Sequence, residues 1–147
     1  MNANNWSVRI GRWAELEPLA LPLRVSVFVQ EQGVPIELEQ DELDEFATHA
    51  VVTDSTAQAL ATGRLVLTEP GSAKIGRLAV AESHRGQGLG KVVLEALIAH
   101  GQRLGVKHLK LHAQRDAERF YLAFGFVAQG EPFMEAGIEH ILMVRLD

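Results

Sequence analysis

The chain has 147 residues, of which 47% are hydrophobic and 22% are charged. That length and composition are typical of one globular domain with a sizeable core, so we expect a single domain over residues 1–147. The formal net charge of −5 argues against a nucleic-acid partner, because such surfaces carry clustered positive charge. Because the chain contains no cysteine, disulfides, thiolate metal sites and cysteine nucleophiles are excluded.

The sequence carries no signal for secretion or membrane insertion. Its N-terminal residues lack the apolar stretch of a signal peptide, and no apolar run is long enough to span a bilayer. We therefore expect a cytoplasmic protein with no membrane partner.

The N-terminal part of the chain predicts a strand and then a helix. Alternating residues predict a short strand over 6–11, and apolar residues at helical spacing predict a helix over 14–30. Pro18 and Pro22 lie inside this helix, so it is expected to be shortened or kinked. Gly33 is expected to end it.

An acidic segment follows the first helix. No lysine or arginine occurs between Arg24 and Arg64. Two interpretations stay open, namely a solvated loop and an acidic rim that attracts a cationic substrate. The acidic residues of this interval are Glu31, Glu37, Glu39, Asp41, Glu42, Asp44, Glu45 and Asp54.

The middle of the chain predicts three strands and a long helix. Residues 48–54 and 59–68 predict two strands joined by a turn, and residues 74–80 predict another. A stripe of leucine, valine and alanine side chains predicts a helix over 89–104, and Gly105 is a suitable stop.

The C-terminal part predicts two strands around a short helix. The strands cover residues 108–113 and 140–146, and the helix covers 117–124 and ends at Gly125. The resulting order, β-α-β-β-β-α-β-α-β, predicts an α/β (α+β) fold with a mixed sheet whose faces are covered by helices.

The stretch "RGQGLGK" at 85–91 places three glycines just before the long helix. The first N–H groups of a helix have no internal partner, and the helix dipole places about +0.5 charge there. Glycines let this backbone approach a ligand closely. A strand, a glycine-rich turn and a helix N-terminus together form a phosphate cradle, although simple turn glycines remain the alternative.

The spacing of these glycines excludes two familiar phosphate loops. A Walker A loop needs glycine at 85 and serine or threonine at 92, whereas the chain has Arg85 and Val92. A dinucleotide-binding G-x-G-x-x-G motif also fails, because it would meet Lys91 or Val93 in place of its last glycine.

Two motifs resemble those of the GNAT acetyltransferase superfamily. Arg85, Gly88 and Gly90 match its acetyl-CoA signature, Arg-x-x-Gly-x-Gly, and residues 120–126, "FYLAFGF", match a second signature, aromatic-Tyr-x-x-x-Gly-Phe. The segments "VFVQEQGVP" at 27–35 and "EAGIEHILM", later in the chain, further resemble a bacterial subgroup that includes the ElaA-type predicted acyltransferases.

The resemblance implies a mostly antiparallel mixed sheet that is splayed open between its fourth and fifth strands and flanked by helices on both faces. The acyl-pantetheine would lie in the split, and the pyrophosphate would bind the amides of the glycine-rich turn. Gln114 stands where the family often has asparagine. The implied acetyl-CoA-binding residues are Leu78, Ala79, Val80, Arg85, Gly86, Gln87, Gly88, Leu89, Gly90, Lys91, Gln114 and Phe120.

The resemblance implies an acetyl-CoA-dependent N-acetyltransferase. It would transfer the acetyl group to a primary amine of a small molecule or peptide by direct attack in a ternary complex. Two alternatives stay open, namely a non-catalytic sensor of acyl-CoA and an acyltransferase with a longer acyl donor. A homodimer is also left open.

Tyr121, the only tyrosine of the chain, is interpreted as the general acid that protonates the leaving thiolate. A CoA thiol resembles a free thiol with a pKa of about 8.5, and tyrosine has a pKa of about 10. Proton donation would then be uphill by about 2 kcal/mol, a gap that the environment can close. The alternative is a core tyrosine that anchors its helix.

Two residues are candidates for the general base that deprotonates the amine. His112 lies on the polar face of its predicted strand, and Glu31 lies near the end of the first helix. Structural roles are expected for His49 and His140. No metal is expected, because the two histidines of one strand face, at 108 and 112, are too few ligands.

Overall fold

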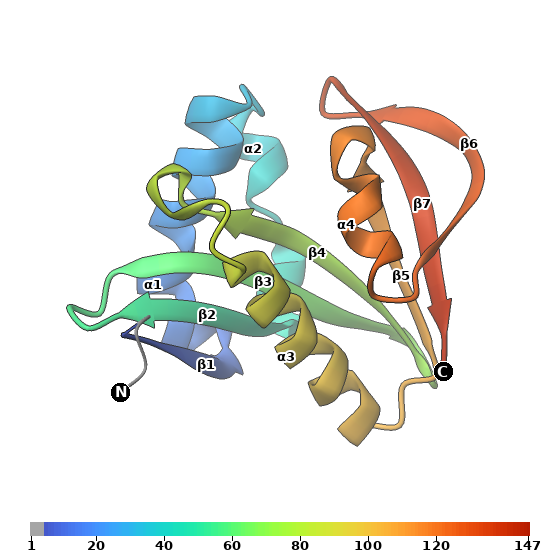
Figure 1. Cartoon of the computed structure of the whole chain (residues 1–147), viewed down its shortest axis with the longest axis horizontal. Helices are drawn as coiled ribbons and strands as arrows, with labels where there is room; N and C mark the ends of the chain where they lie inside the picture. Colours follow the sequence, from blue (N-terminus) through green and yellow to red (C-terminus); the bar gives the residue numbers. More distant parts are fainter. Residues whose placement is uncertain (1–4) are drawn as a thin grey trace.

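Residues 5–147 are described in this computed structural model. In that part of the chain the strands form a seven-stranded sheet in the order β1-β2-β3-β4-β5-β7-β6 (Figure 1). Strands β4 and β5 run parallel and the other neighbours run antiparallel. The expected mixed, mostly antiparallel sheet is therefore confirmed. The strands are β1 (Trp6–Arg12), β2 (Thr48–Asp54), β3 (Ala59–Glu69), β4 (Ser72–Val80), β5 (His108–Gln114), β6 (Val127–Glu135) and β7 (Ile138–Leu146).

Helices cover both faces of the sheet (Figure 1). Successive strand residues point to opposite faces, and β2 shows this directly, because Val51 packs with one helix and Val52 with the other. The helices and helical turns are α1 (Trp13–Arg24), the π-helix η1 (Val25–Glu31), α2 (Ile36–Glu39), η2 (Glu42–Phe46), η3 (Glu82–His84), α3 (Leu89–Arg103), η4 (Arg115–Ala117) and α4 (Glu118–Leu122).

The first helix has the predicted extent but not one regular geometry. Pro18 and Pro22 lie inside α1, and the chain continues from Arg24 into the wider π turns of η1. Short π segments are frequent at functional sites. Here η1 and the residue after it carry Phe28 and Gln32, whose side chains face the split described below.

Strand β6 was missed by the sequence analysis, which predicted six strands. Its sequence, "VAQGEPFME", contains Gly130 and Pro132 and exposes nearly every side chain. Neither an alternation nor an apolar run marks it, because it is an edge strand, where proline is tolerated. Its register against β7 is irregular between Gln129 and Phe133.

The sheet splits between β4 and β5, as expected. The paired register covers Ser72–Ile75 of β4 and His108–Leu111 of β5, and from there the strands diverge (Figure 1). Strand β4 carries an extra residue opposite β3 at the level of Arg77, whose φ is +54°. A bulge bends the strand that contains it, and this bulge lies where β4 leaves β5.

Candidate active site

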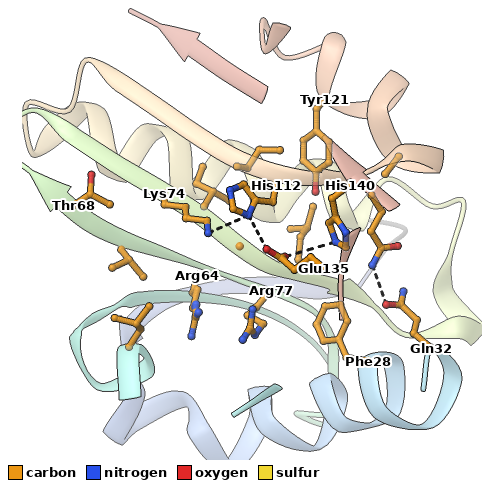
Figure 2. Close-up of a pocket in the computed structure, with 18 of the residues that line it drawn as sticks. Phe28, Gln32, Arg64, Thr68, Lys74, Arg77, His112, Tyr121, Glu135 and His140 are labelled. Atoms are coloured by element: carbon orange, nitrogen blue, oxygen red, sulfur yellow. Dashed lines mark hydrogen bonds and ion pairs between the residues drawn. The ribbon is translucent and has the colours of Figure 1, made fainter. Parts of the chain in front are cut away.

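A cavity of about 470 Å³ occupies the split between β4 and β5 (Figure 2). We call it the central cavity. Its charged and titratable lining residues are Arg64, Lys74, Arg77, His112, Tyr121, Glu135 and His140. A second hollow of about 360 Å³ shares most of these residues and extends the cavity toward α2 and η2.

A further hollow of about 460 Å³ lies over the glycine-rich turn. Its lining shares Leu78, Ala117 and Tyr121 with the central cavity. The two spaces therefore adjoin, and Tyr121 of α4 stands at their junction. A long molecule held at the turn could reach the split without crossing the protein core.

The glycine-rich turn has the geometry that an anion cradle needs. Gly86 and Gly88 have φ values of +80° and +81°, and a Cβ at either position would meet nothing within 4 Å. Within the described chain, the main-chain N–H groups of residues 88–91 make no hydrogen bond to another protein group. They lie at the N-terminus of the 15-residue helix α3, where the dipole favours a negative charge.

Arg85 and Glu31 form an ion pair beside this turn. Arg85 Nη2 lies 2.8 Å from Glu31 Oε1, and Arg85 Nε donates to the Val80 carbonyl at 3.2 Å. Among residues 5–147, Glu31 is not in the lining of the central cavity. Of the two candidate bases, His112 therefore lines the cavity and Glu31 does not.

The other residues implied for acetyl-CoA binding surround the same spaces. Leu78 and Val80 of β4 line the turn hollow, and Phe120 of α4 lies opposite Gly90 across it. Gln114 lines the central cavity and donates from Nε2 to Gln32 Oε1 at 2.9 Å. Leu89 and Lys91 also line the turn hollow. The last two members of the implied set, the buried Ala79 and the exposed Gln87, line neither space.

Tyr121 points its hydroxyl into the central cavity (Figure 2). Its ring packs edge-on against Phe120 and Phe126, with centroids 5.1 and 6.2 Å away. Burial raises the pKa of Tyr121 to about 12. Donation from such a phenol to a thiolate of ordinary pKa, about 8.5, is uphill by about 5 kcal/mol, more than the sequence analysis expected. The same apolar surroundings raise the pKa of the CoA thiol as well, which reduces the free-energy cost of this proton transfer.

His112 belongs to a polar cluster in the central cavity, together with Lys74, Glu135 and His140 (Figure 2). Its Nδ1 lies 2.9 Å from Glu135 Oε1 and 3.4 Å from Lys74 Nζ. Glu135 Oε2 also lies 3.8 Å from His140 Nε2. Burial acts to raise the pKa of Glu135, but the hydrogen bond from His112 and the neighbouring positive charges together outweigh it, so that this pKa is lowered. An ionised Glu135 accepts a hydrogen bond from the N–H at Nδ1 of His112, and in this tautomer Nε2 keeps a free lone pair.

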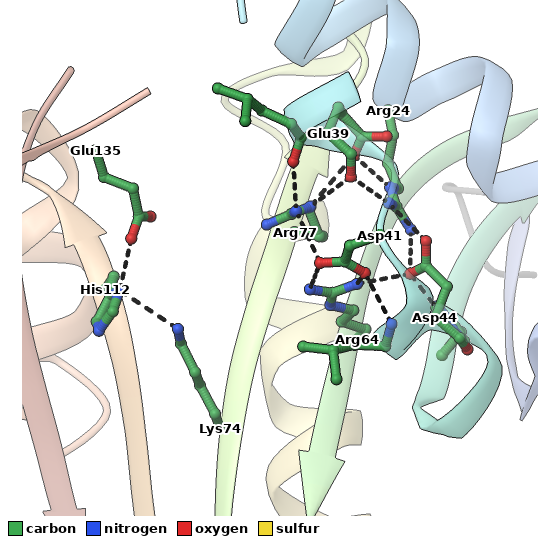
Figure 3. Close-up of polar contacts among 12 residues, drawn as sticks. Arg24, Glu39, Asp41, Asp44, Arg64, Lys74, Arg77, His112 and Glu135 are labelled. Carbon is green, nitrogen blue, oxygen red and sulfur yellow. Dashed lines mark hydrogen bonds and ion pairs between the residues drawn. The ribbon is translucent and has the colours of Figure 1, made fainter. Parts of the chain in front are cut away.

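Three of the eight acidic residues of the acidic segment are built into an internal ion network (Figure 3). Arg24 bridges Glu39 and Asp44, with Nε 2.7 Å from Glu39 Oε2 and Nη1 2.8 Å from Asp44 Oδ1. Arg64 binds Asp41 with both terminal nitrogens, at 2.7 and 2.8 Å. Burial acts to raise the pKa of Asp44, but hydrogen bonds from the two arginines outweigh it and lower this pKa.

Neither interpretation of the acidic segment is therefore right for this network. Its three carboxylates are matched by Arg24, Arg64 and Arg77, so they form neither a solvated loop nor a free negative rim. The network instead fixes α2 and η2 against β3 and β4 and forms one wall of the central cavity. His49 is buried beneath it, with Nε2 2.9 Å from the Asp44 carbonyl.

Several cavity residues were not predicted from the sequence. Lys74 and Glu135 both occur in segments that the sequence analysis used, the fourth strand and "EAGIEHILM", but nothing local distinguishes them from surface charges. They become recognisable only when β6 folds back along β7 and carries Glu135 to His112. His140, for which a structural role was expected, also faces the cavity.

Comparison with known proteins agrees with this geometry. The sequence family described as "Acetyltransferase (GNAT) domain" matches residues 18–146. The Bacillus subtilis protein "Uncharacterized N-acetyltransferase YjcF" is 36% identical over 127 residues, which cover 86% of this chain and 89% of that one. The chain belongs to the GNAT acetyltransferase family, and the resemblance inferred from its motifs is confirmed.

Solved structures confirm the fold. Escherichia coli ElaA superposes with a TM-score of 0.85 at 27% identity, over 95% of this chain and 99% of that one. An acyl-CoA N-acyltransferase of Pseudomonas aeruginosa gives the same TM-score and coverage at 33% identity. A GNAT acetyltransferase of Elizabethkingia anophelis, with acetyl-CoA bound, is similar in fold, with a TM-score of 0.69, 17% identity and coverage of 97% and 99%.

Within residues 5–147 no helix is long and apolar enough to cross a membrane.

Proposed function

We propose that the protein is an acetyl-CoA-dependent N-acetyltransferase that acetylates a primary amine by direct attack in a ternary complex. The observation that carries the proposal is the junction at Tyr121, where the hollow over the glycine-rich turn meets the central cavity. A diphosphate bound to the free N–H groups of residues 88–91 would direct the pantetheine arm along the unpaired end of β4. The thioester would then enter the split.

The central cavity supplies groups for both proton transfers. An alkylammonium of pKa about 10.4 costs roughly 4–5 kcal/mol to deprotonate at neutral pH. In the proposed reaction Nε2 of His112 accepts this proton, while Glu135 holds Nδ1 and fixes the orientation of the ring. The amine nitrogen forms a bond to the acetyl carbon, the carbon–sulfur bond breaks, and Tyr121 gives its proton to the departing thiolate.

Release of free thiol from acetyl-CoA in the presence of a panel of amines tests the activity. We expect amine-dependent thiol release together with a product whose mass is increased by one acetyl group. If acetyl-CoA binds but no amine promotes thiol release, the protein is a sensor and not a transferase. Competition between acetyl-CoA and longer acyl-CoAs tests the choice of donor.

Replacing Gly88 with valine is expected to raise the Kd for acetyl-CoA at least tenfold, or about 1.4 kcal/mol. The valine side chain would occupy the open space at the turn, and φ of +81° disfavours any residue with a Cβ. Calorimetric titration of the purified variant measures this Kd. Gly130→Val is the matched control, because Gly130 has φ of +82° and equally open surroundings but lies in β6. An unchanged Kd in the Gly88 variant would remove the cradle from the proposal.

Replacing His112 with glutamine is expected to lower kcat by about 10²-fold or more, because general bases typically contribute 10²–10⁴-fold. The Kd for acetyl-CoA should stay the same. Steady-state thiol release with the best amine of the panel measures kcat. His108→Gln is the matched control, since His108 is an exposed residue at the start of the same strand. Equal kcat values for the two variants would exclude His112 as the base.

A further inference from the structure

Lys74 is a cation of the central cavity whose hydrogen-bonding capacity is unused. Its side chain is half-buried, and in the described chain no carboxylate lies within 4.0 Å of Nζ. Its polar contact is with Nδ1 of His112 at 3.4 Å, a nitrogen that Glu135 already engages at 2.9 Å. One ring nitrogen cannot donate to Glu135 and accept from Lys74 at once. At least two of the three ammonium donors therefore have no protein acceptor within the described chain.

Arg77 adds a second group of the same kind. Its Nε donates to the Glu39 carbonyl at 3.1 Å, and its Nη2 donates to the Leu38 carbonyl at 3.1 Å and to Asp41 at 3.2 Å. Within residues 5–147, Nη1 of Arg77 makes no hydrogen bond. Figure 3 shows the guanidinium reaching out of the ion network toward the side on which Lys74 and His112 lie. Arg64, in contrast, uses both terminal nitrogens on carboxylates.

These free donors indicate that the cavity binds a hydrogen-bond acceptor, and their positive charge favours an anion. A half-buried ammonium is costly when no carboxylate is in direct contact with it. Burial lowers the pKa of Lys74, and the charge of Glu135 acts in the opposite direction without reversing this shift. A bound anion would supply the missing partner with charge-assisted hydrogen bonds. A cationic group placed beside Lys74 and Arg77 would instead meet two positive charges.

We propose that Lys74 and Arg77 bind the carboxylate of the acceptor, and that the acceptor is a free α-amino acid. The inference rests on the function proposed above. Because Lys74 Nζ lies 3.4 Å from the His112 ring, an anion on Lys74 is placed beside the base that takes the proton of the amine. Carboxylate and amine must then be close together in the acceptor, as they are in an α-amino acid, in which one carbon atom carries both groups. The remaining wall, with Phe28, Leu43 and Val66, suits an apolar side chain.

Equilibrium binding tests the inference without turnover. Each amino acid is titrated against its carboxamide by calorimetry, with and without saturating CoA, and leucine is also compared with 3-methylbutylamine. We expect at least one apolar amino acid to bind about tenfold or more tightly than its carboxamide. Lys74→Met should abolish this preference and leave the affinity for the carboxamide unchanged, and Lys74→Arg should retain part of it. Lys107→Met, at an exposed lysine remote from the cavity, should keep the preference.

The outcomes separate this inference from the proposed function. If carboxamides or simple amines bind and are acetylated as well as the amino acids, the inference is overturned and the acetyltransferase stands. Equal loss of affinity for acid and amide in the Lys74→Met variant overturns it too. If amino acids bind with the expected preference but acetyl-CoA is neither bound nor cleaved, the proposed function fails and the carboxylate site remains.

Discussion

The Tyr121→Phe variant is expected to retain its affinity for acetyl-CoA and to lose a factor of about 10²–10⁴ in kcat, the range that general acids contribute. The substitution removes one oxygen and keeps the ring, so the packing against Phe120 and Phe126 is preserved. Because the pKa of Tyr121 is raised to about 12, the phenol is protonated throughout the usual assay range. The variant therefore removes a proton donor and no negative charge.

Two measurements check this expectation. Steady-state thiol release at saturating acetyl-CoA gives kcat, and calorimetry gives the Kd for acetyl-CoA. The defect is also expected to shrink with an acetyl thioester of a more acidic thiol, because such a leaving group needs less proton donation. A purely structural role for Tyr121 would produce the same defect with every leaving group. Wild-type turnover in the variant would exclude the assignment.

The fold could be predicted wherever the local sequence alone determines the conformation of the chain. Apolar residues at helical spacing are what bury one face of α3, so residues 89–104 indicated the helix to within a residue of its observed end at Arg103. The glycine-rich turn was recognisable for the same reason, because φ values near +80° are accessible mainly to glycine. Strand β6 has no such local constraint, because its side chains are exposed and its conformation depends on pairing with β7.

The ion network could not be predicted, because its partners are 15 to 38 residues apart in the chain. One signal was present, however. Arg24 lies on the same helix face as Leu16, Ala20 and Leu23, all of them buried. An arginine at a buried position requires a carboxylate partner, and the acidic segment that follows is the nearest supply. The segment was interpreted without reference to this arginine.

The two parts of the candidate site differ in the same way, because one depends on local sequence and the other on contacts between distant residues. The cradle consists of backbone and lies within one short stretch, so its motif specified it. The central cavity is lined by side chains from nine separate elements, and which of them face inward depends on the divergence of β4 and β5 and on the bulge at Arg77. Sequence reasoning could offer both His112 and Glu31 as bases. Only the geometry brings one of them to the split and pairs the other with Arg85.

Replacing Arg24 with methionine is expected to lower the free energy of unfolding by about 3–5 kcal/mol, the usual cost of removing one partner from a buried ion pair. Arg24 is 1% exposed and its guanidinium lies 5.0 Å from the Trp13 ring. Without it Glu39, whose Oε1 already has no partner within the described chain, would keep only the 3.3 Å contact with Arg77. Methionine fills similar space, so the loss reflects uncompensated charge more than a cavity.

Urea unfolding at neutral pH measures the effect. Arg9→Met is the matched control, because Arg9 is an exposed residue of the edge strand β1 and its loss should change stability by no more than about 0.5 kcal/mol. Adding Glu39→Gln and Asp44→Asn to the Arg24 variant should restore part of the loss, since the two carboxylates that have lost Arg24, of which Asp44 keeps Arg64, are then neutral. A loss below about 1 kcal/mol in Arg24→Met, or no recovery in the triple variant, would show that the network does not hold α2 and η2 against the sheet.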